Sequence, residues 1–344
     1  MKKRISLIVI VIVVSLFTFN FSLAQSEKDT IYIASWNMEN LFDAIDDADK
    51  RDEEFLPDGK KEWTQEKIDQ KIENQAKVIQ WMNDGNGPDL LGFQEVEHQH
   101  LIETLIERHF SDKNYKVAYQ ETLDKRGIDN GLIYDADKFE VLNIKPIEVE
   151  LASKYPTRYI LEVHLRKIGG EELYLYVNHW PSRSGGELKS RPNRIKAATV
   201  LREAIDSLYK RNDKLNLVIL GDFNDMPNNL SIARYLWTQQ FTCTINTEPL
   251  RLYNLSYKDF LLGNGTYLYR GNWNMLDQII VSNEVVGDGA IKYLCNSFEL
   301  VKPDFMITQS GKYKGAATPT FGGRTYLGGY SDHIPVGAKF IFTK

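Results

Sequence analysis

The sequence contains few cysteines and has no excess of basic residues. Only Cys243 and Cys295 occur in 344 residues, too few for a disulfide framework; they can pair with each other or remain free thiols. The formal net charge is −5 at pH 7, so the chain as a whole does not attract a polyanion, and contacts with anionic groups would need a local basic patch or a metal. No Ser/His/Asp or Cys/His arrangement typical of covalent catalysis is visible.

Long hydrophobic runs are also missing, with one exception at the N-terminus. A basic start is followed by an apolar run, residues 5–17, and by the small residues Ser22 and Ala24. This order predicts a signal peptide over residues 1–24, which would make the mature protein secreted or periplasmic. The remainder, residues 25–344, shows neither an internal repeat nor a linker. We therefore expect one domain that has no membrane span and is a monomer.

Short apolar stretches alternate with amphipathic helical patterns along this domain, which is typical of an α/β protein. The acidic stretch from Asp43 to Glu54 lacks the central glycine and the regular ligand spacing of a calcium loop, so we interpret it as a solvated surface loop. The predicted helices cover residues 64–82, 99–109 and 194–210, and the predicted strands include residues 31–37, 89–95, 130–134, 159–165, 173–177, 217–220, 278–282 and 336–340.

Polar residues follow several of these strands where they end. The strand over residues 217–220 leads into Gly221-Asp222-Phe223-Asn224, which places a carboxylate and an amide on one turn. Ligands of α/β sheets bind at such strand ends, so these side chains are candidates for a catalytic site. A single residue of this kind is more often a cap or a solvated turn, and it is the joint occurrence that carries the prediction. The set comprises Asn37, Glu95, His179, Asp222, Asn224, Asp277 and His333.

The motifs around these residues resemble those of the endonuclease/exonuclease/phosphatase superfamily, which includes deoxyribonuclease I-like and exonuclease III-like nucleases. They follow the family's order and span nearly the whole mature chain, and Gly-Asp-x-Asn with a terminal Ser-Asp-His is the most specific pair. The resemblance implies an α/β (α+β) fold, a four-layered, deoxyribonuclease I-like sandwich of two β-sheets flanked by helices. The motifs are Ser35-Trp36-Asn37-Met38-Glu39-Asn40, Gln94-Glu95-Val96, Asn178-His179-Trp180, Gly221-Asp222-Phe223-Asn224, Leu276-Asp277-Gln278 and Ser331-Asp332-His333.

The resemblance also implies a role for each residue. Glu95 would bind a divalent metal, Mg²⁺ or Mn²⁺ in its place, and Asn37 and Asp332 would complete its oxygen ligands. Asp222 would orient or deprotonate an attacking water, and Asn224 would hydrogen-bond a phosphoryl oxygen. The remaining assignments are that His179 and His333 contact the scissile phosphate, that Asp277 fixes the tautomer of His333, and that Asp129 and Asn178 are candidates for orienting His179.

A basic stretch that begins near His179 supplies candidates for binding the phosphates that flank the scissile one. These are Arg183, Arg191 and Arg194, together with Arg324 from a glycine-rich loop; the alternative is a helix start with surface basic residues. The resulting prediction is a secreted, metal-dependent nuclease that cleaves DNA or RNA. The alternatives are a phosphatase or phosphodiesterase for a small phosphorylated molecule or a phospholipid headgroup, similar to inositol phosphatases or sphingomyelinases, and a binding protein without turnover.

Overall fold

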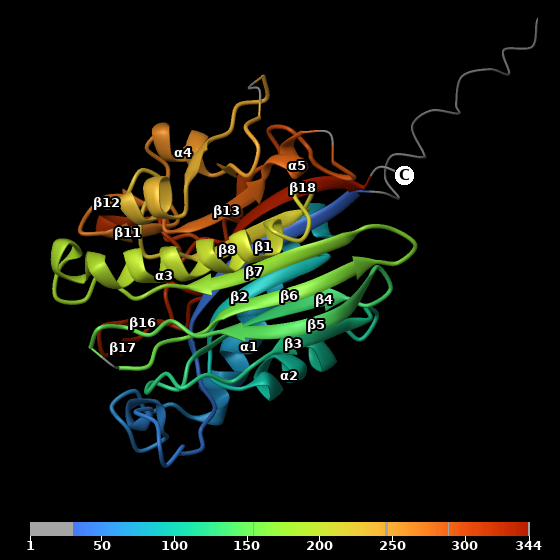
Figure 1. Cartoon of the computed structure of the whole chain (residues 1–344). Helices are drawn as coiled ribbons and strands as arrows, with labels where there is room; N and C mark the ends of the chain where they lie inside the picture. The colour runs from blue at the N-terminus through green and yellow to red at the C-terminus, as the bar shows by residue number, and fades with distance from the viewer. Residues whose placement is uncertain (1–29, 154, 245–246, 288, 343–344) are drawn as a thin grey trace, which may run out of the picture.

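Two seven-stranded β-sheets form the centre of the fold in the computed structural model, which describes residues 30–153, 155–244, 247–287 and 289–342 (Figure 1). The predicted signal peptide lies outside the described residues. The first sheet has the order β14 (Ile291–Tyr293), β18 (Val336–Phe342), β1 (Thr30–Leu41), β2 (Leu90–Val96), β4 (Asp129–Asp135) and β3 (Tyr115–Tyr119), with β15 (Glu299–Leu300) also paired to β18. The second has the order β5 (Phe139–Ile147), β6 (Ile160–Lys167), β7 (Glu172–His179), β8 (Leu217–Asp222), β13 (Asp277–Ser282), β10 (Leu252–Asn254) and β9 (Thr238–Gln240).

The alternation of side chains along the strands explains why the two sheets stack. In β1, Ile31 and Ile33 pack into the apolar layer between the sheets, whereas Tyr32 and Trp36 point to the opposite face. That outer face is covered by α1 (Gln65–Trp81) and α2 (Gln99–His109). The second sheet is covered on its outer face by α3 (Glu187–Tyr209), which lies across β7 and β8 in Figure 1. The predicted sandwich of two sheets flanked by helices is thus confirmed.

The two sheets approach each other closely at Gly92 of β2. A Cβ atom on this residue would lie 2.2 Å from Leu220 Cδ1 of β8, so a larger side chain would push the sheets apart. The contact brings the ends of β2 and β8 together, and both strands lead into motifs that the sequence analysis singled out.

Helix α3 begins earlier than the sequence predicts. It starts at Glu187, after Gly186, instead of at Arg194, and it contains Pro192. The helix therefore includes most of the basic stretch, part of which lay outside the predicted helix, and this agrees with the alternative of a helix start with basic residues. The predicted helix over residues 64–82 agrees closely with α1, which follows Thr64 and ends at Trp81.

Two short hairpins and a disulfide complete the periphery. The hairpins are β11 (Tyr267–Tyr269) with β12 (Asn272–Asn274), and β16 (Phe321–Gly322) with β17 (Thr325–Tyr326), and the short helices α4 (Tyr257–Leu261) and α5 (Asn283–Val286) lie near the second sheet. Cys243 and Cys295 are joined by a disulfide, which settles the alternative left open by the sequence. Among the described residues, we find no helix with both the length and the apolar character needed to cross a membrane.

Candidate active site

The candidate catalytic residues come together because the central strands of both sheets end at the same edge of the sandwich. β8 and β13 pair so that Asp222 lies opposite Asp277, and β7 and β8 pair so that His179 lies beside Asp222. In the other sheet, Asn37 of β1 lies beside Gln94 of β2, one residue before Glu95. The segment that leads into β18 adds the remaining polar residues. Residues that are up to 296 positions apart in the sequence thereby share one site.

Asp222 lies at the centre of this site. Its Oδ1 atom accepts a hydrogen bond from the Asn224 backbone N–H at 2.8 Å, and its Oδ2 atom accepts one from Asn37 Nδ2 at 3.2 Å. Two imidazoles approach the same Oδ2 atom, with His179 Nε2 at 3.6 Å and His333 Nε2 at 4.0 Å. Burial raises the pKa of Asp222 to about 6; the neighbouring Asp277 adds to this rise, whereas His333 opposes it. A carboxylate with a pKa near neutrality, beside two imidazoles, is suited to accepting a proton.

His333 is held in one orientation by Asp277. Its Nδ1 atom lies 2.7 Å from Asp277 Oδ2, and the ring of Tyr267 stacks on the imidazole at a centroid distance of 4.8 Å. Burial opposes protonation of His333, but Asp277, together with Asp222, raises the imidazole pKa well above its ordinary value. His333 is therefore an imidazolium at neutral pH, with its Nε2–H directed toward Asp222 and available to an anionic group.

His179 lies on the other side of Asp222 and is held differently. Burial lowers its pKa well below the ordinary value, and the nearby Arg158 lowers it further. The predicted pairing with Asp129 is wrong, because the Asp129 oxygens accept hydrogen bonds from the Tyr119 hydroxyl and the Thr122 backbone N–H. In the described part of the chain, His179 Nδ1 is buried and has no hydrogen-bond partner. His179 is thus a neutral imidazole whose Nε2 atom faces Asp222 and Glu95.

The residues expected to bind metal lie beside this group. Glu95 Oε1 is 3.7 Å from His179 Nε2, and its Oε2 atom accepts a hydrogen bond from the Asn40 backbone N–H. Burial raises the pKa of Asp332, and the negative charges of Glu39 and Glu95 raise it further. No hydrogen bond to the Asp332 carboxylate is found within the described ranges. Crowded carboxylates of this kind gain stability when a cation lies between them.

The carboxylates of Glu39, Glu95 and Asp332 fit Mg²⁺ better than a metal ion that takes all of its ligands from the protein. Glu39, Glu95 and Asp332 do not belong to the described groups whose ligand atoms all lie within 4.8 Å of one another. Mg²⁺ is usually bound through one or two carboxylates and keeps several waters, so it does not require such a compact group. The compact group at the centre of the site is Asp222, Asp277 and His333. In this group the imidazole of His333 is already hydrogen-bonded to Asp277.

Sequence reasoning missed two residues at this site, Glu39 and Lys71. Glu39 is buried, and its Oε2 atom accepts a hydrogen bond from the Thr320 backbone N–H at 2.7 Å. Lys71 of α1 is 1% exposed and donates to Thr320 Oγ1, with Glu39 and Asp332 nearby as counter-charges. The signal for Glu39 was its place in the motif after Asn37; the signal for Lys71 was a charge on the apolar face of α1, beside Ile68 and Ile72.

Strained turns hold several of these side chains at the strand ends. Glu95 and Asn224 adopt positive φ angles of 62° and 49°, a conformation that side chains with a Cβ rarely take. Gly221 has a φ of 133°, and a Cβ atom there would lie 2.0 Å from the Asn178 carbonyl oxygen. The glycine before Asp222 is thus required by the close passage of β7. Because of their positive φ angles, Glu95 and Asn224 do not continue the alternation of a regular strand, and their side chains turn toward the site.

The predicted phosphate-binding arginines do not line a common binding surface, since Arg183 and Arg194 both approach the Asp225 carboxylate. Arg194 is fully buried, and its guanidinium contacts Asp225 at 2.8 Å, so its assignment as a substrate ligand is wrong. Arg183 donates to the Asn224 carbonyl and to Asn274 Oδ1, and it therefore braces the Asn224 turn. Arg191 is partly exposed on α3, and Arg324 is exposed between β16 and β17.

Asn178 has a structural role in the same region. Its Nδ2 atom donates to the Tyr176 and Leu220 carbonyls, and its Oδ1 atom accepts from Trp180 Nε1 at 3.0 Å. These contacts tie β7 to β8 and do not involve the imidazole of His179. Asn178 therefore positions the strand that carries His179 and does not orient its ring.

Comparisons with known proteins agree with this fold. A model of the endonuclease/exonuclease/phosphatase family matches residues 32–342, whereas none of the curated proteins matches the chain. Two solved structures from Bacteroides thetaiotaomicron, an endonuclease/exonuclease/phosphatase family protein and a mannosyl-6-phosphatase, are each 18% identical with a TM-score of 0.57; the alignments cover 91% of this chain and 95% and 100% of theirs. The human Nocturnin catalytic domain is 17% identical over 91% of this chain and 95% of its own, with a TM-score of 0.54.

Proposed function

The chain belongs to the endonuclease/exonuclease/phosphatase family, and we propose that it is a secreted, Mg²⁺-dependent phosphoester hydrolase that acts on a small phosphorylated molecule. The observation that carries the proposal is the convergence of Asn37, His179 and His333 on one buried carboxylate, Asp222. The signal peptide expected over residues 1–24 supports secretion. A binding protein without turnover would not need a carboxylate of raised pKa between two imidazoles.

The chain's own residues account for the main requirements of in-line attack by water. Asp222 accepts a proton from the attacking water, and Asn37 Nδ2 and the Asn224 backbone hold this carboxylate in place. The imidazolium of His333, fixed by Asp277, offers a proton donor to the anionic phosphoryl oxygens. When bound by Glu95, Asp332 and Glu39, Mg²⁺ would supply charge neutralisation at the phosphoryl group. In one transition state, Asp222 thus removes a proton from the water, and His333 stabilises the negative charge on the phosphoryl oxygens.

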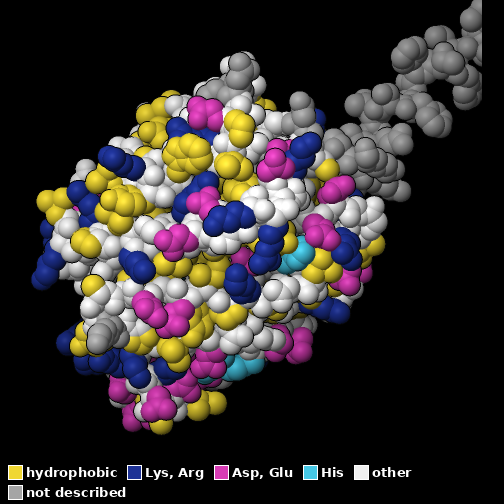
Figure 2. All heavy atoms as spheres, viewed as in Figure 1, with side chains coloured by type: hydrophobic (Ala, Val, Ile, Leu, Met, Phe, Trp, Pro, Cys, Tyr) yellow, Lys and Arg dark blue, Asp and Glu magenta, His cyan; other side chains and the backbone are white. Residues whose placement is uncertain are grey.

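The surroundings of the site favour a small substrate over a nucleic acid. Arg194 and Arg183 are engaged in internal contacts, and on the face that carries α3 the basic and acidic side chains are intermixed (Figure 2). Beside Glu39 lies a pocket of about 210 Å³ whose walls include Phe55, Lys61 and Phe321. Such a pocket suits one organic group with a polar substituent. One of the structural relatives is named a mannosyl-6-phosphatase, which is consistent with a phosphorylated sugar as the substrate class to test first.

A substrate panel on the mature protein, residues 25–344, tests the proposal. It contains sugar phosphates, inositol polyphosphates, a bis-aryl phosphate, sphingomyelin, plasmid DNA, single-stranded DNA and RNA. We expect the highest kcat/KM on a small phosphate ester, with activity abolished by EDTA and restored by Mg²⁺ or Mn²⁺. A clear preference for a polymer would establish the nuclease alternative instead, and full activity in excess chelator would exclude the metal-dependent mechanism.

The raised pKa of Asp222 predicts an acid limb in the pH profile of kcat/KM. The carboxylate accepts a proton only when it is ionised, so activity should fall tenfold per pH unit below a pKa near 6. Binding of Mg²⁺ nearby would move this limb to lower pH. Asp277→Asn removes the charge that keeps His333 protonated, so it should lower activity at the alkaline end of the profile. An acid limb that persists unchanged in Asp222→Asn would assign the limb to another group.

A further inference from the structure

The pocket beside Glu39 lies between three segments that are far apart in the sequence: the end of β1, the segment before α1, and the β16–β17 hairpin with the residue that precedes it. Its walls include Glu39, Asn40, Phe55, Lys61, Thr320 and Phe321. The Asn40 backbone N–H donates to Glu95 Oε2 at 3.1 Å, so the pocket borders a predicted Mg²⁺ ligand. Asn37, the neighbour of Asp222, precedes Asn40 by three residues, which span at most about 11 Å. A ring attached to a phosphoryl group beside Asp222 can therefore reach this pocket.

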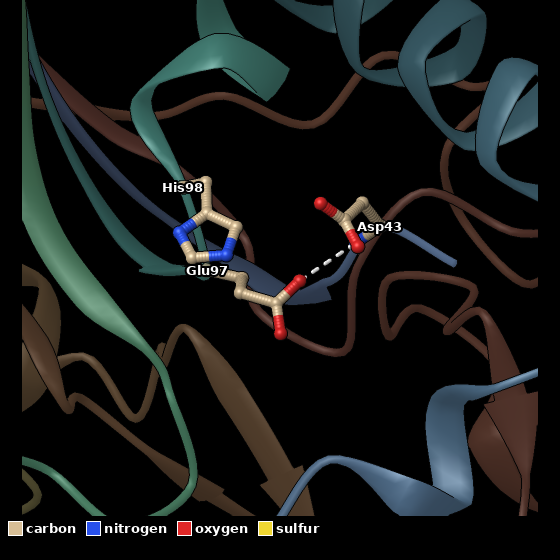
Figure 3. A group of neighbouring side chains, drawn as sticks. All are labelled: Asp43, Glu97 and His98. Atoms are coloured by element: carbon tan, nitrogen blue, oxygen red, sulfur yellow. Dashed lines mark hydrogen bonds between the residues drawn. The ribbon is translucent and has the colours of Figure 1, made fainter. Parts of the chain in front are cut away.

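The acidic segment after β1 holds Phe55 in the pocket wall. The Asp43 backbone N–H donates to Glu97 Oε2 at 2.8 Å (Figure 3), and the Asp47 backbone N–H donates to Asp52 Oδ2 at 3.0 Å. Asp52 is 1% exposed, and its carbonyl accepts a hydrogen bond from the Phe55 N–H at 2.7 Å. Our interpretation of this segment as a solvated surface loop is thus wrong for its buried members, and its folded end fixes the position of Phe55.

Two aromatic rings form the apolar part of the wall, and both are supported from behind by Trp63. The Trp63 side chain is fully buried. Its ring centroid lies 6.0 Å from that of Phe55 and 5.7 Å from that of Phe321. Phe55 also stacks on Phe42 at a centroid distance of 4.3 Å. The two rings are therefore held in place before a ligand binds, and they offer apolar surface to the C–H groups of a ring.

Lys61 and Asn40 add hydrogen-bonding groups to the same pocket. The Lys61 ammonium lies 4.3 Å from the centroid of the Phe321 ring and donates to the Gly323 carbonyl at 2.8 Å. An ammonium has three N–H donors, and among the described residues this is the one hydrogen bond that it makes, so donors remain for a ligand. The side-chain amide of Asn40, which is partly exposed, makes no hydrogen bond within the described ranges. It offers both a donor and an acceptor.

The size and the charge of the pocket limit what it can hold. A volume of about 210 Å³ equals that of about seven water molecules at about 30 Å³ each, which is room for one ring and not for a polymer. The positive charge of Lys61 is matched by the negative charge of Glu39 in the same wall. The lining residues therefore provide no excess positive charge for a second phosphate group.

We propose that this pocket binds the hydroxylated ring of a sugar monophosphate; this subsite rests on the function proposed above and names the residues that select the substrate. Lys61 and Asn40 bind the ring hydroxyls, and the C–H face of the ring packs against Phe321. Hydroxyl groups both donate and accept hydrogen bonds, as this mixed set of partners requires. A ring without hydroxyls would leave the amide and the ammonium without partners, which opposes its binding.

Three phosphate esters test the subsite on the mature protein with Mg²⁺. They are a hexose 6-phosphate, cyclohexylmethyl phosphate, which has a six-membered ring without hydroxyls, and a hexose 1,6-bisphosphate. We expect kcat/KM for the hexose 6-phosphate to exceed that for cyclohexylmethyl phosphate by at least about tenfold, because the hydroxyl contacts are lost in the latter. It should also exceed kcat/KM for the bisphosphate. An equal or higher kcat/KM on either of the other two esters overturns the proposal.

Lys61→Met removes the ammonium and keeps an unbranched side chain. It should raise KM for the hexose 6-phosphate by about 10–100-fold, as expected for the loss of a hydrogen bond from a charged group, and should raise KM for cyclohexylmethyl phosphate much less. Lys60→Met, an exposed neighbour, is the matched control and should change neither value. Equal rises on both esters overturn the proposal. If Lys61→Met does not fold, Asn40→Gly, which suits the positive φ of 52° at this position, should show the same difference between the esters.

Binding of unreactive analogues separates this subsite from the hydrolase function. Calorimetry compares the methylene phosphonates that correspond to the hexose 6-phosphate and to cyclohexylmethyl phosphate. Tighter binding of the sugar phosphonate supports the subsite even if no ester is hydrolysed, in which case the proposed function alone fails. Equal binding of the two phosphonates, or no binding of either, overturns the subsite, whether or not the protein hydrolyses phosphate esters.

Discussion

Replacing Asp222 by asparagine is expected to lower kcat by about 10²–10⁴-fold, the usual contribution of a general base. The substitution keeps the size of the side chain and retains an acceptor for the Asn224 N–H, but it removes the negative charge that faces His179 and His333. Substrate binding should survive or become slightly tighter, because one carboxylate near the phosphate is lost. Steady-state kinetics on the best small phosphate ester and calorimetric binding of an unreactive analogue measure the two effects.

Variants of His333 and Asp277 test whether these residues act together with Asp222. His333→Ala should also lower kcat, and Asp277→Asn should lower it less, because Asp277 acts through the orientation of His333. The losses should not add in the Asp222→Asn/His333→Ala double variant, since both groups act on one transition state. Circular dichroism and thermal unfolding show that each variant is folded. A folded Asp222→Asn protein with near-normal turnover would exclude this strand end as the catalytic centre.

The sequence was sufficient to predict the fold and to place the strand ends that build the site. Asp222 and His179 are the last residues of β8 and β7, and Asp277 is the first residue of the antiparallel β13. Short apolar runs mark buried strands, and the polar residues that flank these runs lie at the sheet edge. The family motifs gave the order of these strands in the chain. The sandwich itself is confirmed, whereas the roles of the individual side chains remain proposals.

The errors concern the hydrogen-bond partners of polar side chains, which the spacing of apolar residues does not show. Asp129 was placed near His179, but Tyr119 and Thr122 take both of its oxygens. Lys71 lies on the apolar face of its helix, which signals that it is buried, but the spacing does not indicate its partner Thr320, 249 positions away. Hydrogen-bond partners across such distances depend on strand register and loop path, which a local pattern does not determine.

Arg194 provides the sharpest example, because a charged residue in an amphipathic helix is normally exposed. Here the side chain faces inward from α3 and pairs with Asp225, in the turn after β8. Four further acceptors surround the guanidinium, namely Ser190 Oγ and the carbonyls of Pro181, Ser182 and Glu187. The ion pair therefore links the start of α3 to the turn that carries Asn224, and its contribution is to stability and positioning.

This structural role predicts a large loss of stability in Arg194→Ala. Removing Arg194 leaves the buried Asp225 with only the more distant guanidinium of Arg183, 3.7 Å away, and the Ser231 hydroxyl. The free energy of unfolding should therefore fall by about 3 kcal/mol, the lower end of the range for breaking a buried ion pair. Arg191→Ala, three residues earlier on the same helix and partly exposed, is the matched control and should change it by less than about 0.5 kcal/mol. Urea denaturation of both variants measures the difference. If Arg194 bound substrate phosphate instead, Arg194→Ala would be as stable as the control and would raise KM, because the arginine would then have no buried partner to lose.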